Sequence, residues 1–191
     1  MADAFASPYD PYRPDPRPGQ LWRLEWEGTV ALGVLTSVTE RMVDVAPVGD
    51  DPEFADPATV ICAEPSPVGY PIGIWVGLER AVPRVVLDLP IAALQPAKLG
   101  LVLDVRHRLR TGRPLPSDDA LGAPLVDSAD MTDPRIAYRL ELEEPLTRLA
   151  EVFALVEPVE MPVPDDSAHR GEFGLSLIAA DEAISKPATP Q

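Results

Sequence analysis

The chain has 191 residues, a length that fits one domain with appendages. It carries 31 acidic and 16 basic residues, a net charge of −15, which argues against a general nucleic-acid-binding role because binding phosphates requires cations. Apolar residues make up 46% of the chain, so it can build a packed core, although 24 prolines indicate irregular segments.

The chain has few of the cysteine and histidine residues that bind metals or carry out redox chemistry. Cys62 is the single cysteine and the two histidines, His107 and His169, are far apart in sequence, so no disulfide, zinc site or iron–sulfur cluster is expected. We expect no cofactor. The N-terminus lacks the basic and apolar regions of a secretion signal, and no apolar run approaches the ~20 residues of a membrane helix. We therefore expect a cytoplasmic protein without a membrane partner, and the Arg-rich, Asn-free composition indicates a GC-rich bacterial genome.

The first half of the chain predicts short strands behind a proline-rich arm. Residues 1–18 hold five prolines, which favour an extended or disordered arm. Trp22, Leu24 and Trp26 alternate with charged residues, and the dipeptide Glu27-Gly28 predicts a tight turn. The next run is almost entirely apolar, as in a strand buried on both faces. The expected strands are 20–26, 29–38, 42–48, 58–63, 72–78 and 82–89. Their spacing predicts a small β-barrel or sandwich.

The second half predicts helices. We expect a short helical turn at 90–94 and a helix at 99–109 that ends before Gly112. Asp133 and Pro134 predict a capped helix start, and its apolar spacing continues to about Glu157, with a break into two helices at Glu144-Pro145. The fold class is therefore α+β. The expected organisation is an arm (1–18), a small barrel (19–95), a helical extension (96–157), and an acidic linker with a docking segment (158–191).

Four stretches of the strand region resemble a known family. They are Pro18-Gly19-Gln20-Leu21-Trp22-Arg23-Leu24, Val30-Ala31-Leu32-Gly33-Val34-Leu35-Thr36-Ser37, Val43-Asp44-Val45-Ala46-Pro47-Val48 and, more loosely, residues 74–82. They resemble the opening strand, the second strand, the third strand with its proline–aliphatic pair, and a later strand of the MazF/PemK-type toxins. The resemblance covers residues 18–95 and implies an SH3-like barrel, a toxin–antitoxin relationship and, in members that cleave RNA, endoribonuclease activity.

At two positions the sequence differs from the family members that cleave RNA, and both positions bear on that activity. Family members that cleave RNA carry an arginine just before the second strand and a serine or threonine straight after the proline–aliphatic pair. Here these places hold Gly28-Thr29 and Gly49. Without the cation, charge developing on a phosphate goes unstabilised, and a donor of that kind is typically worth about 10²–10³ in rate. The resemblance thus implies the fold without the activity, and a nuclease would have to use Arg23, Ser37 and Arg41.

Charged and aromatic residues suggest few other sites. Arg106, Arg110 and Arg113 form a basic island that either binds a partner or pairs with the chain's own carboxylates, in Asp118-Asp119 and the acidic tail. The acidic runs 127–133 and 50–53 indicate caps and turns rather than a metal site. The three tryptophans and Cys62 are expected in the core.

The segment 173–184 is the last apolar stretch, behind an acidic linker. Its residues Phe173, Leu175, Leu177 and Ile178 either fold back on the body or bind a partner.

Three functions remain open. The preferred hypothesis is a non-catalytic binding or regulatory protein that docks onto a protein, either a second copy of itself or a basic protein attracted by its charge. The alternatives are an endoribonuclease toxin-like protein with a displaced active site and an acidic mimic of nucleic acid. Charge favours the first, since residues 19–95 hold 4 basic and 11 acidic residues, a net charge of −7.

Overall fold

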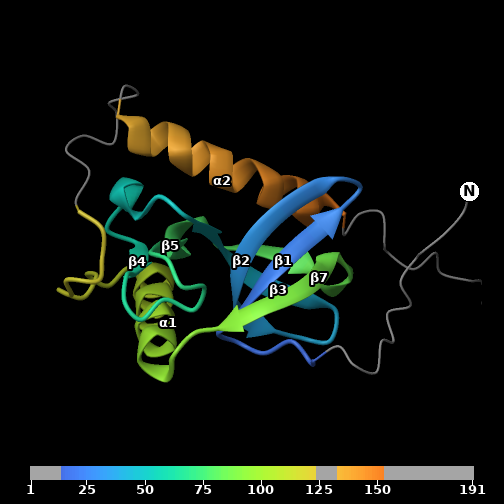
Figure 1. The fold of residues 1–191 in the computed structure, drawn as a ribbon, viewed down its shortest axis with the longest axis horizontal. Helices are drawn as coiled ribbons and strands as arrows, with labels where there is room; N and C mark the ends of the chain where they lie inside the picture. Colours follow the sequence, from blue (N-terminus) through green and yellow to red (C-terminus); the bar gives the residue numbers. More distant parts are fainter. Residues whose placement is uncertain (1–13, 124–132, 153–191) are drawn as a thin grey trace, which may run out of the picture. The chain divides into compact units, whose positions relative to one another are not determined.

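The computed structural model describes residues 14–123 and 133–152, which form strands followed by helices (Figure 1). The strands are β1 (Gln20–Trp26), β2 (Thr29–Val38), β3 (Met42–Gly49), β4 (Thr59–Cys62), β5 (Ile72–Trp75), β6 (Arg80–Pro83) and β7 (Leu87–Ala93). The helices are α1 (Pro96–Thr111) and α2 (Pro134–Glu151), with single 3₁₀ turns at Pro52–Phe54, Val76–Leu78 and Arg84–Val86. The predicted α+β class is confirmed. Most of the proline-rich arm, the acidic linker and the docking segment lie outside the described residues.

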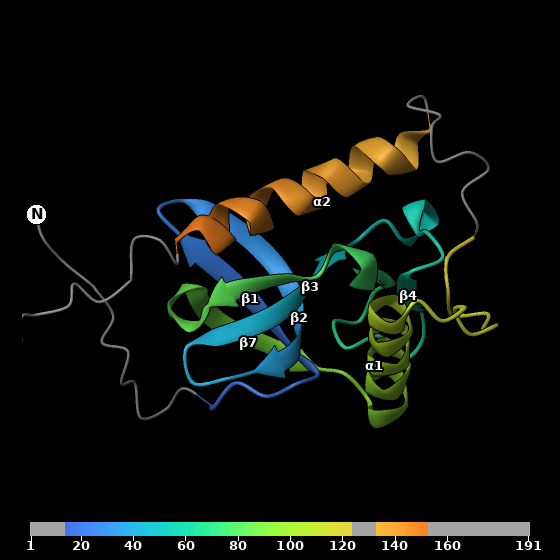
Figure 2. The ribbon, with the colours of Figure 1, turned by 180° about the vertical axis from the view of Figure 1, so that it is seen from behind.

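The strands form one antiparallel, barrel-like sheet in the order β4-β5-β3-β2-β1-β7, with β6 paired to β3. Figure 2 shows α2 above the strands β1, β2 and β7, and α1 beside β4. Strands β1 and β2 make a hairpin whose turn residues, Glu27 and Gly28, have φ values of 48° and 82°. Positive φ at both positions matches the right-handed twist of the strands. The tight turn that the sequence predicted at Glu27-Gly28 is confirmed. At the other end of the path, β7 pairs with β1.

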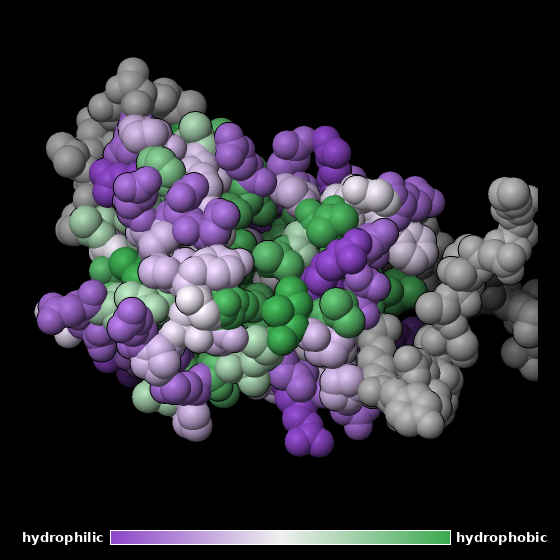
Figure 3. Space-filling view, in the orientation of Figure 1, coloured by the Kyte–Doolittle hydropathy of each residue, from purple (hydrophilic) through white to green (hydrophobic). Residues whose placement is uncertain are grey.

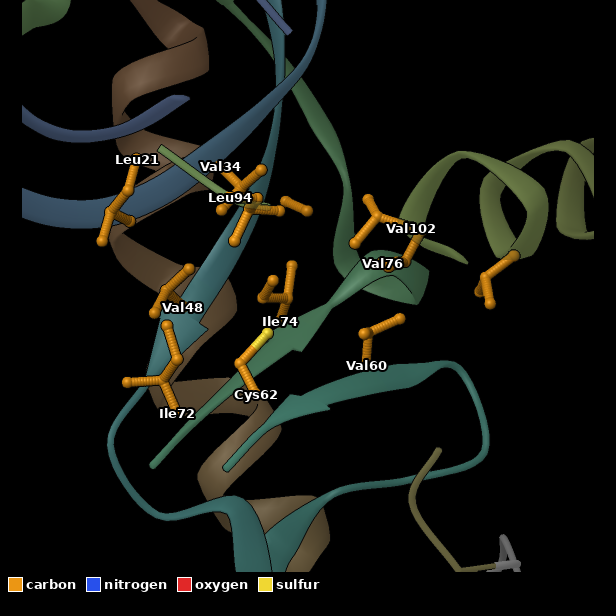
Figure 4. Close-up of a cluster of buried hydrophobic side chains, with 12 residues drawn as sticks. Leu21, Val34, Val48, Val60, Cys62, Ile72, Ile74, Val76, Leu94 and Val102 are labelled. Atoms are coloured by element: carbon orange, nitrogen blue, oxygen red, sulfur yellow. The ribbon is translucent and has the colours of Figure 1, made fainter. Parts of the chain in front are cut away.

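Two groups of buried apolar side chains hold the helices on the sheet. The α1 core is shown in Figure 4 and contains Leu21, Val34, Ala46, Val48, Val60, Cys62, Ile72, Ile74, Val76, Leu94, Val102 and Val105. The α2 core contains Trp22, Leu24, Leu35, Val43, Val45, Val82, Val86, Leu87, Leu146, Leu149 and Val152. Successive residues of β1 and β2 enter different cores, because alternate side chains of a strand point to opposite faces.

The expectation that Cys62 and the tryptophans belong to the core is confirmed. Cys62 and Trp22 have no exposed surface, Trp75 is 1% exposed, and Trp26 packs against the α2 core. Burial raises the pKa of the Cys62 thiol, an effect that the nearby Lys98 partly opposes.

Several expectations about strands are wrong. The expected strand 72–78 ends at Trp75, and the expected strand 82–89 is divided by the 3₁₀ turn Arg84–Val86. Strand β2 is not buried on both faces, since Val30 and Leu32 in its first half are 45% and 36% exposed. Residues 90–94 do not form a helical turn, because all but Leu94 belong to β7, the strand that pairs with β1. Pro90 is tolerated there because β7 lies at the end of the sheet path, where a missing ladder donor costs little.

Two of the helix boundaries that the sequence predicted are confirmed, although α1 begins at Pro96, before the expected residue 99. Helix α1 ends at Gly112 in the left-handed conformation, with φ of 64°. Helix α2 begins after Asp133, whose carboxylate accepts a hydrogen bond of 2.9 Å from the backbone N–H of Arg135. Side-chain hydrogen bonds from Arg135 lower the pKa of Asp133.

The predicted break at Pro145 is wrong, because α2 continues through this residue as one helix. Proline costs about 3 kcal/mol inside a helix, and burial compensates for it here. Leu146 and Leu149, just after the proline, are fully buried in the α2 core and hold the second half of the helix on the sheet. Within the described ranges, neither helix is long and apolar enough to cross a membrane.

Candidate functional site

The main cluster of polar groups joins α1 to the sheet, and we call it the Arg106 cluster. It consists of Thr36 on β2, Asp44 on β3, Glu79 before β6, and Arg106 and Arg110 on α1. Arg106 Nε lies 2.6 Å from Glu79 Oε2, and Arg106 Nη2 pairs with Asp44 Oδ2. Arg110 Nη2 lies 2.7 Å from Glu79 Oε1 and 3.3 Å from Asp44 Oδ2.

A threonine hydroxyl completes the Arg106 cluster. Thr36 Oγ1 lies 2.6 Å from Glu79 Oε2 and 3.2 Å from the Asp44 carbonyl oxygen, and the shorter contact identifies Glu79 as the main acceptor. The register of β2 on β3 shifts between Leu35 and Ser37, the interval that contains Thr36. A bulge of this kind re-aims a side chain, which explains how Thr36 reaches the two carboxyl-bearing residues.

The Arg106 cluster is charge-balanced and largely shielded from solvent. The Arg106 and Glu79 side chains are 17% and 12% exposed, whereas Arg110 is 58% exposed. The hydrogen bond and the charge of Glu79 raise the pKa of the Arg110 guanidinium. Two positive groups thus face two negative groups, and the arrangement fastens α1 without presenting net charge.

The three arginines of the predicted basic island have different surroundings in the structure. Arg106 and Arg110 pair with carboxylates of their own chain, but with Asp44 and Glu79 rather than with the expected Asp118-Asp119. Arg113 is exposed and lies beyond the end of α1. The tail residues proposed to bind a partner, Phe173, Leu175, Leu177 and Ile178, lie outside the described residues.

The three groups suggested for a displaced nuclease site do not meet. Arg23 on β1 pairs with Glu25 and lies 3.4 Å from Asp88, and its neighbour across the strands is Leu32. Ser37 lies five residues further along β2, which is about 16 Å at the rise of an extended strand. Arg41 is exposed in the turn between β2 and β3.

The position after the proline–aliphatic pair is closed by α2. A Cβ atom added to Gly49 would collide with the Tyr138 hydroxyl and would lie 3.0 Å from Trp75 Cζ3. The Tyr138 ring packs at a tilt against the rings of Trp75 and Phe54, with ring centroids 5.3 and 5.1 Å away. A serine or threonine at position 49 therefore has no room unless Tyr138 moves. At the other position where the chain differs from RNA-cleaving toxins, Gly28 lies in a turn in the left-handed conformation.

A second polar cluster, around Asp56, ties α2 to the sheet. The Asp56 side chain is 2% exposed and ion-paired with Arg139. It also accepts hydrogen bonds from the Ala58 backbone N–H at 2.8 Å and from Thr59 Oγ1 at 2.9 Å. These contacts satisfy a buried carboxylate and indicate a structural role.

The acidic run 50–53 contacts α2 rather than forming an evident metal site. Tyr138 Oη lies 3.4 Å from both Asp50 Oδ1 and the Asp51 backbone nitrogen. Among the described residues, no group of three or more His, Cys, Asp or Glu side chains is arranged to hold a metal ion. The run 127–133 lies outside the described residues except for Asp133, which caps α2.

An exposed surface of apolar and charged side chains lies on β2, β1 and β7, and we call it the outer face. It consists of Val30, Leu32, Arg23, Glu25, Leu89 and Ile91. Leu89 and Ile91 are 54% and 43% exposed. Figure 3 shows apolar surface gathered over these strands beside charged side chains. Sequence reasoning missed this surface because it placed 29–38 inside the core.

Comparison with known proteins gives a fold-level likeness. No protein-family model and no curated protein matches the chain. A solved endoribonuclease from a mycobacterial species is 14% identical, covering 55% of this chain and 99% of its own, with a TM-score of 0.44. A mycobacterial endoribonuclease in complex with its cognate antitoxin is 15% identical, covering 53% and 97%, with a TM-score of 0.41.

Proposed function

We propose that this chain is a non-catalytic binding protein that acts by docking onto a protein partner. The observation that carries the proposal is the position of Tyr138 beside Gly49. The resemblance to RNA-cleaving toxins implies a hydroxyl group at this position, and here a glycine is covered by an aromatic ring of α2. A site that lacks its hydroxyl and is occupied by another part of the chain does not support phosphate chemistry.

The electrostatics support the same proposal. Cleaving RNA requires cations that are free to stabilise the charge developing on a phosphate. Arg106 and Arg110 face Asp44 and Glu79, and Arg23 faces Glu25 and Asp88. A phosphate would have to displace a carboxylate at either place, against a chain of net charge −15.

The proposed partner is a protein, and the outer face and the tail residues 173–178 are the surfaces assigned to docking. The proposal is tested by measuring which proteins co-purify with the tagged full chain, with a Leu32→Glu variant, and with a chain that ends at residue 157. Loss of a specific partner in either variant, at unchanged folding, supports docking. The same recovery from all three chains contradicts the assigned surfaces.

A second candidate function is an endoribonuclease whose active site is the Arg106 cluster. What favours it is the meeting of Thr36, Glu79 and two guanidinium groups within hydrogen-bond distance. In such a site Glu79 would take the proton of a ribose 2′-hydroxyl, whose oxygen would bond to the adjacent phosphorus. The 5′-oxygen of the next nucleotide would leave and take a proton from water, and the arginines would stabilise the phosphate. Cleavage of mixed RNA that is abolished by Glu79→Gln would establish this function and overturn the first, provided that the control Glu143→Gln, on α2 and paired with Arg80, retains it.

Mimicry of nucleic acid is a variant of the docking proposal in which the partner is a basic nucleic-acid-binding protein. It is supported by the net charge of −15 alone. A complex of this kind dissociates steeply as salt rises, because counterions compete for the charged surfaces. A partner that remains bound in about 0.5 M salt would exclude it.

A further inference from the structure

The two halves of α2 are attached to the sheet differently. Leu146 and Leu149 are the buried residues of this helix, and both follow Pro145. Residues 134–144, the first half, have no buried side chain. In Figure 1 the first half lies near β4 and β5, and the second half lies along β1 and β2. Pro145 lacks the N–H that would bond to the carbonyl of residue 141, so the halves meet at a weak point of the helix.

The first half places the Tyr138 ring on a bare patch of the sheet. Gly49 of β3 and Gly73 of β5 are direct partners in the register. A Cβ atom at Gly49 would collide with the Tyr138 hydroxyl, and one at Gly73 would lie 2.6 Å from Trp75 Cζ3. The paired glycines thus leave room for two rings, and Phe54 contributes a third beside Tyr138. We call the site formed by Gly49, Gly73, Trp75 and Phe54 the aromatic slot.

A buried carboxylate lies next to the aromatic slot. Thr59 Oγ1 donates a hydrogen bond of 2.9 Å to Asp56, and Thr59 Cγ2 lies 3.3 Å from the Cβ position of Gly73. The Asp56 side chain is 2% exposed and pairs with Arg139, the residue that follows Tyr138. One ring and one guanidinium from adjacent residues therefore fill the slot and neutralise the carboxylate. The site has the chemistry to select an aromatic group followed by a cation.

Tyr138 fills the slot without satisfying every polar group there. Its hydroxyl oxygen lies 3.4 Å from Asp50 Oδ1 and from the Asp51 backbone nitrogen, which is long for a hydrogen bond. Within the described part of the chain, the buried indole N–H of Trp75 has no hydrogen-bond partner. Buried polar groups without good partners cost free energy. A contact of this quality, on the half of the helix without buried residues, is one that can exchange.

We propose that the aromatic slot, together with Asp56, binds a protein partner, and that Tyr138 and Arg139 are its intramolecular ligand. The partner carries an aromatic residue next to an arginine or lysine, and it replaces the first half of α2, which swings away at Pro145. This inference rests on the proposed docking function and adds a third surface, closed until the partner binds. Basic residues in the partner suit a chain of net charge −15. The opened site still lacks a hydroxyl at Gly49.

Peptide binding to the full chain tests the exchange. The probe is a labelled peptide with the sequence of residues 133–144, measured by fluorescence anisotropy in about 150 mM salt. If roughly 1–10% of the parent chain is open, its apparent affinity is reduced about 10–100-fold. We expect Tyr138→Ala to tighten binding at least about ten-fold, and Leu140→Ala, at a position that is 56% exposed, to leave it unchanged. Equal affinities of the parent and Tyr138→Ala chains would overturn the proposal.

Three further measurements locate the peptide. A probe with Tyr138→Ala is expected to bind the Tyr138→Ala chain at least about ten-fold more weakly, because it cannot fill the slot. Gly49→Ser/Tyr138→Ala, which places a side chain in the slot, is expected to lose the gain in affinity. Arg80→Ala breaks the ion pair with Glu143 outside the slot and is expected to tighten binding about two- to five-fold. Circular dichroism verifies folding, and tight binding by the double variant would overturn the proposal.

Hydrogen exchange tests the opening itself. An isolated helix of about 12 residues is marginal in water, so a detached first half loses the protection of its amides. In the parent chain we expect amides 139–144 to exchange at least about ten-fold faster than amides 146–149. Equal protection of the two sets would contradict opening at Pro145.

The covered site and the docking function fail in different ways. If the peptide does not bind the Tyr138→Ala chain, but Leu32→Glu or the chain ending at residue 157 loses a co-purifying protein, the covered site is wrong and docking stands. If the peptide does not bind and no variant changes what co-purifies, both are wrong.

Discussion

Glu79 and Arg106 are joined by an ion pair of 2.6 Å that links the segment before β6 to helix α1. Both side chains are more than four-fifths shielded from solvent. The same Glu79 carboxylate accepts a hydrogen bond from the Thr36 hydroxyl, so one acidic group connects the helix with the bulged part of β2. The pair explains how a helix with few fully buried residues, Val102 and Val105, keeps its place on the sheet.

Removing Arg106 is expected to destabilise the fold. Arg106→Ala leaves Asp44 and Glu79 facing one another with only the exposed Arg110 to balance them. Unpaired, partly buried carboxylates are costly, and we expect the free energy of unfolding to fall by about 2 kcal/mol in urea titrations. Arg113→Ala, on an exposed arginine of the same basic island, is the control and is expected to change it by less than about 0.5 kcal/mol. Equal effects of the two variants would show that the cluster contributes nothing.

Restoring a hydroxyl after the proline–aliphatic pair is expected to fail. Gly49→Ser places Cβ against the Tyr138 ring and Trp75, and overpacking of this kind costs about 1–3 kcal/mol. Thermal unfolding should show a lower midpoint than for the parent chain. The double variant Gly49→Ser/Tyr138→Ala removes the obstruction, so its loss should be smaller than the sum of the two single losses. Additive losses would mean that Tyr138 does not restrict position 49.

The buried carboxylate of Asp56 is expected to matter more for its hydrogen bonds than for its charge. Asp56→Asn keeps an oxygen that can accept from Ala58 and Thr59, but loses the ion pair with Arg139. Asp56→Ala loses all three contacts. We expect unfolding free energies lower by about 1–2 kcal/mol for the first variant and about 3 kcal/mol for the second. Asp119→Ala, at an exposed position, serves as the control, and a reversed order of the two Asp56 variants would contradict this account.

Cys62 is expected to be unreactive while the chain is folded. Burial raises the pKa of its thiol, so less thiolate is present at pH 8 than in a free cysteine, and the side chain has no exposed surface. Labelling by a disulfide reagent should be slow in buffer and complete within seconds in denaturant. Fast labelling of the native chain would contradict the burial.

The raised pKa of the Cys62 thiol makes the free energy of unfolding fall at high pH. The folded chain keeps the Cys62 proton at pH values where the unfolded chain releases it. The contribution is therefore fully present below the unfolded pKa of about 8.5 and declines as the pH rises above it. Urea titrations at pH 8 and pH 10 should show a smaller decline for Cys62→Ala than for the parent chain. An equal decline would contradict the linkage.

Local patterns in the sequence predict much of this fold. The alternation around Trp22, the turn at Glu27-Gly28, the end of α1 at Gly112 and the start of α2 at Asp133 each depend on neighbouring residues. Such signals act within a few positions, and the structure confirms all four. The paired strands β1, β2 and β3 follow from the same local signals.

The sequence analysis did not predict features that depend on contacts between residues far apart in the chain. Residues 90–94 contain a proline, and only pairing with β1 explains why most of them form a strand. Arg106 meets Asp44 and Glu79 across 62 and 27 positions of the chain, so its partners could not be read from nearby acidic residues. The exposure of Val30 and Leu32 depends on which side of β2 is left uncovered, and apolar composition alone does not reveal that.

The central claim, that this barrel binds without cleaving, is tested most directly by an RNA cleavage assay. Purified full-length chain is incubated with mixed-sequence RNA at low salt, alongside the Glu79→Gln and Arg106→Ala variants, and product ends are counted over time. The account predicts the same background for all three proteins. Cleavage by the parent chain that disappears in both variants would contradict it.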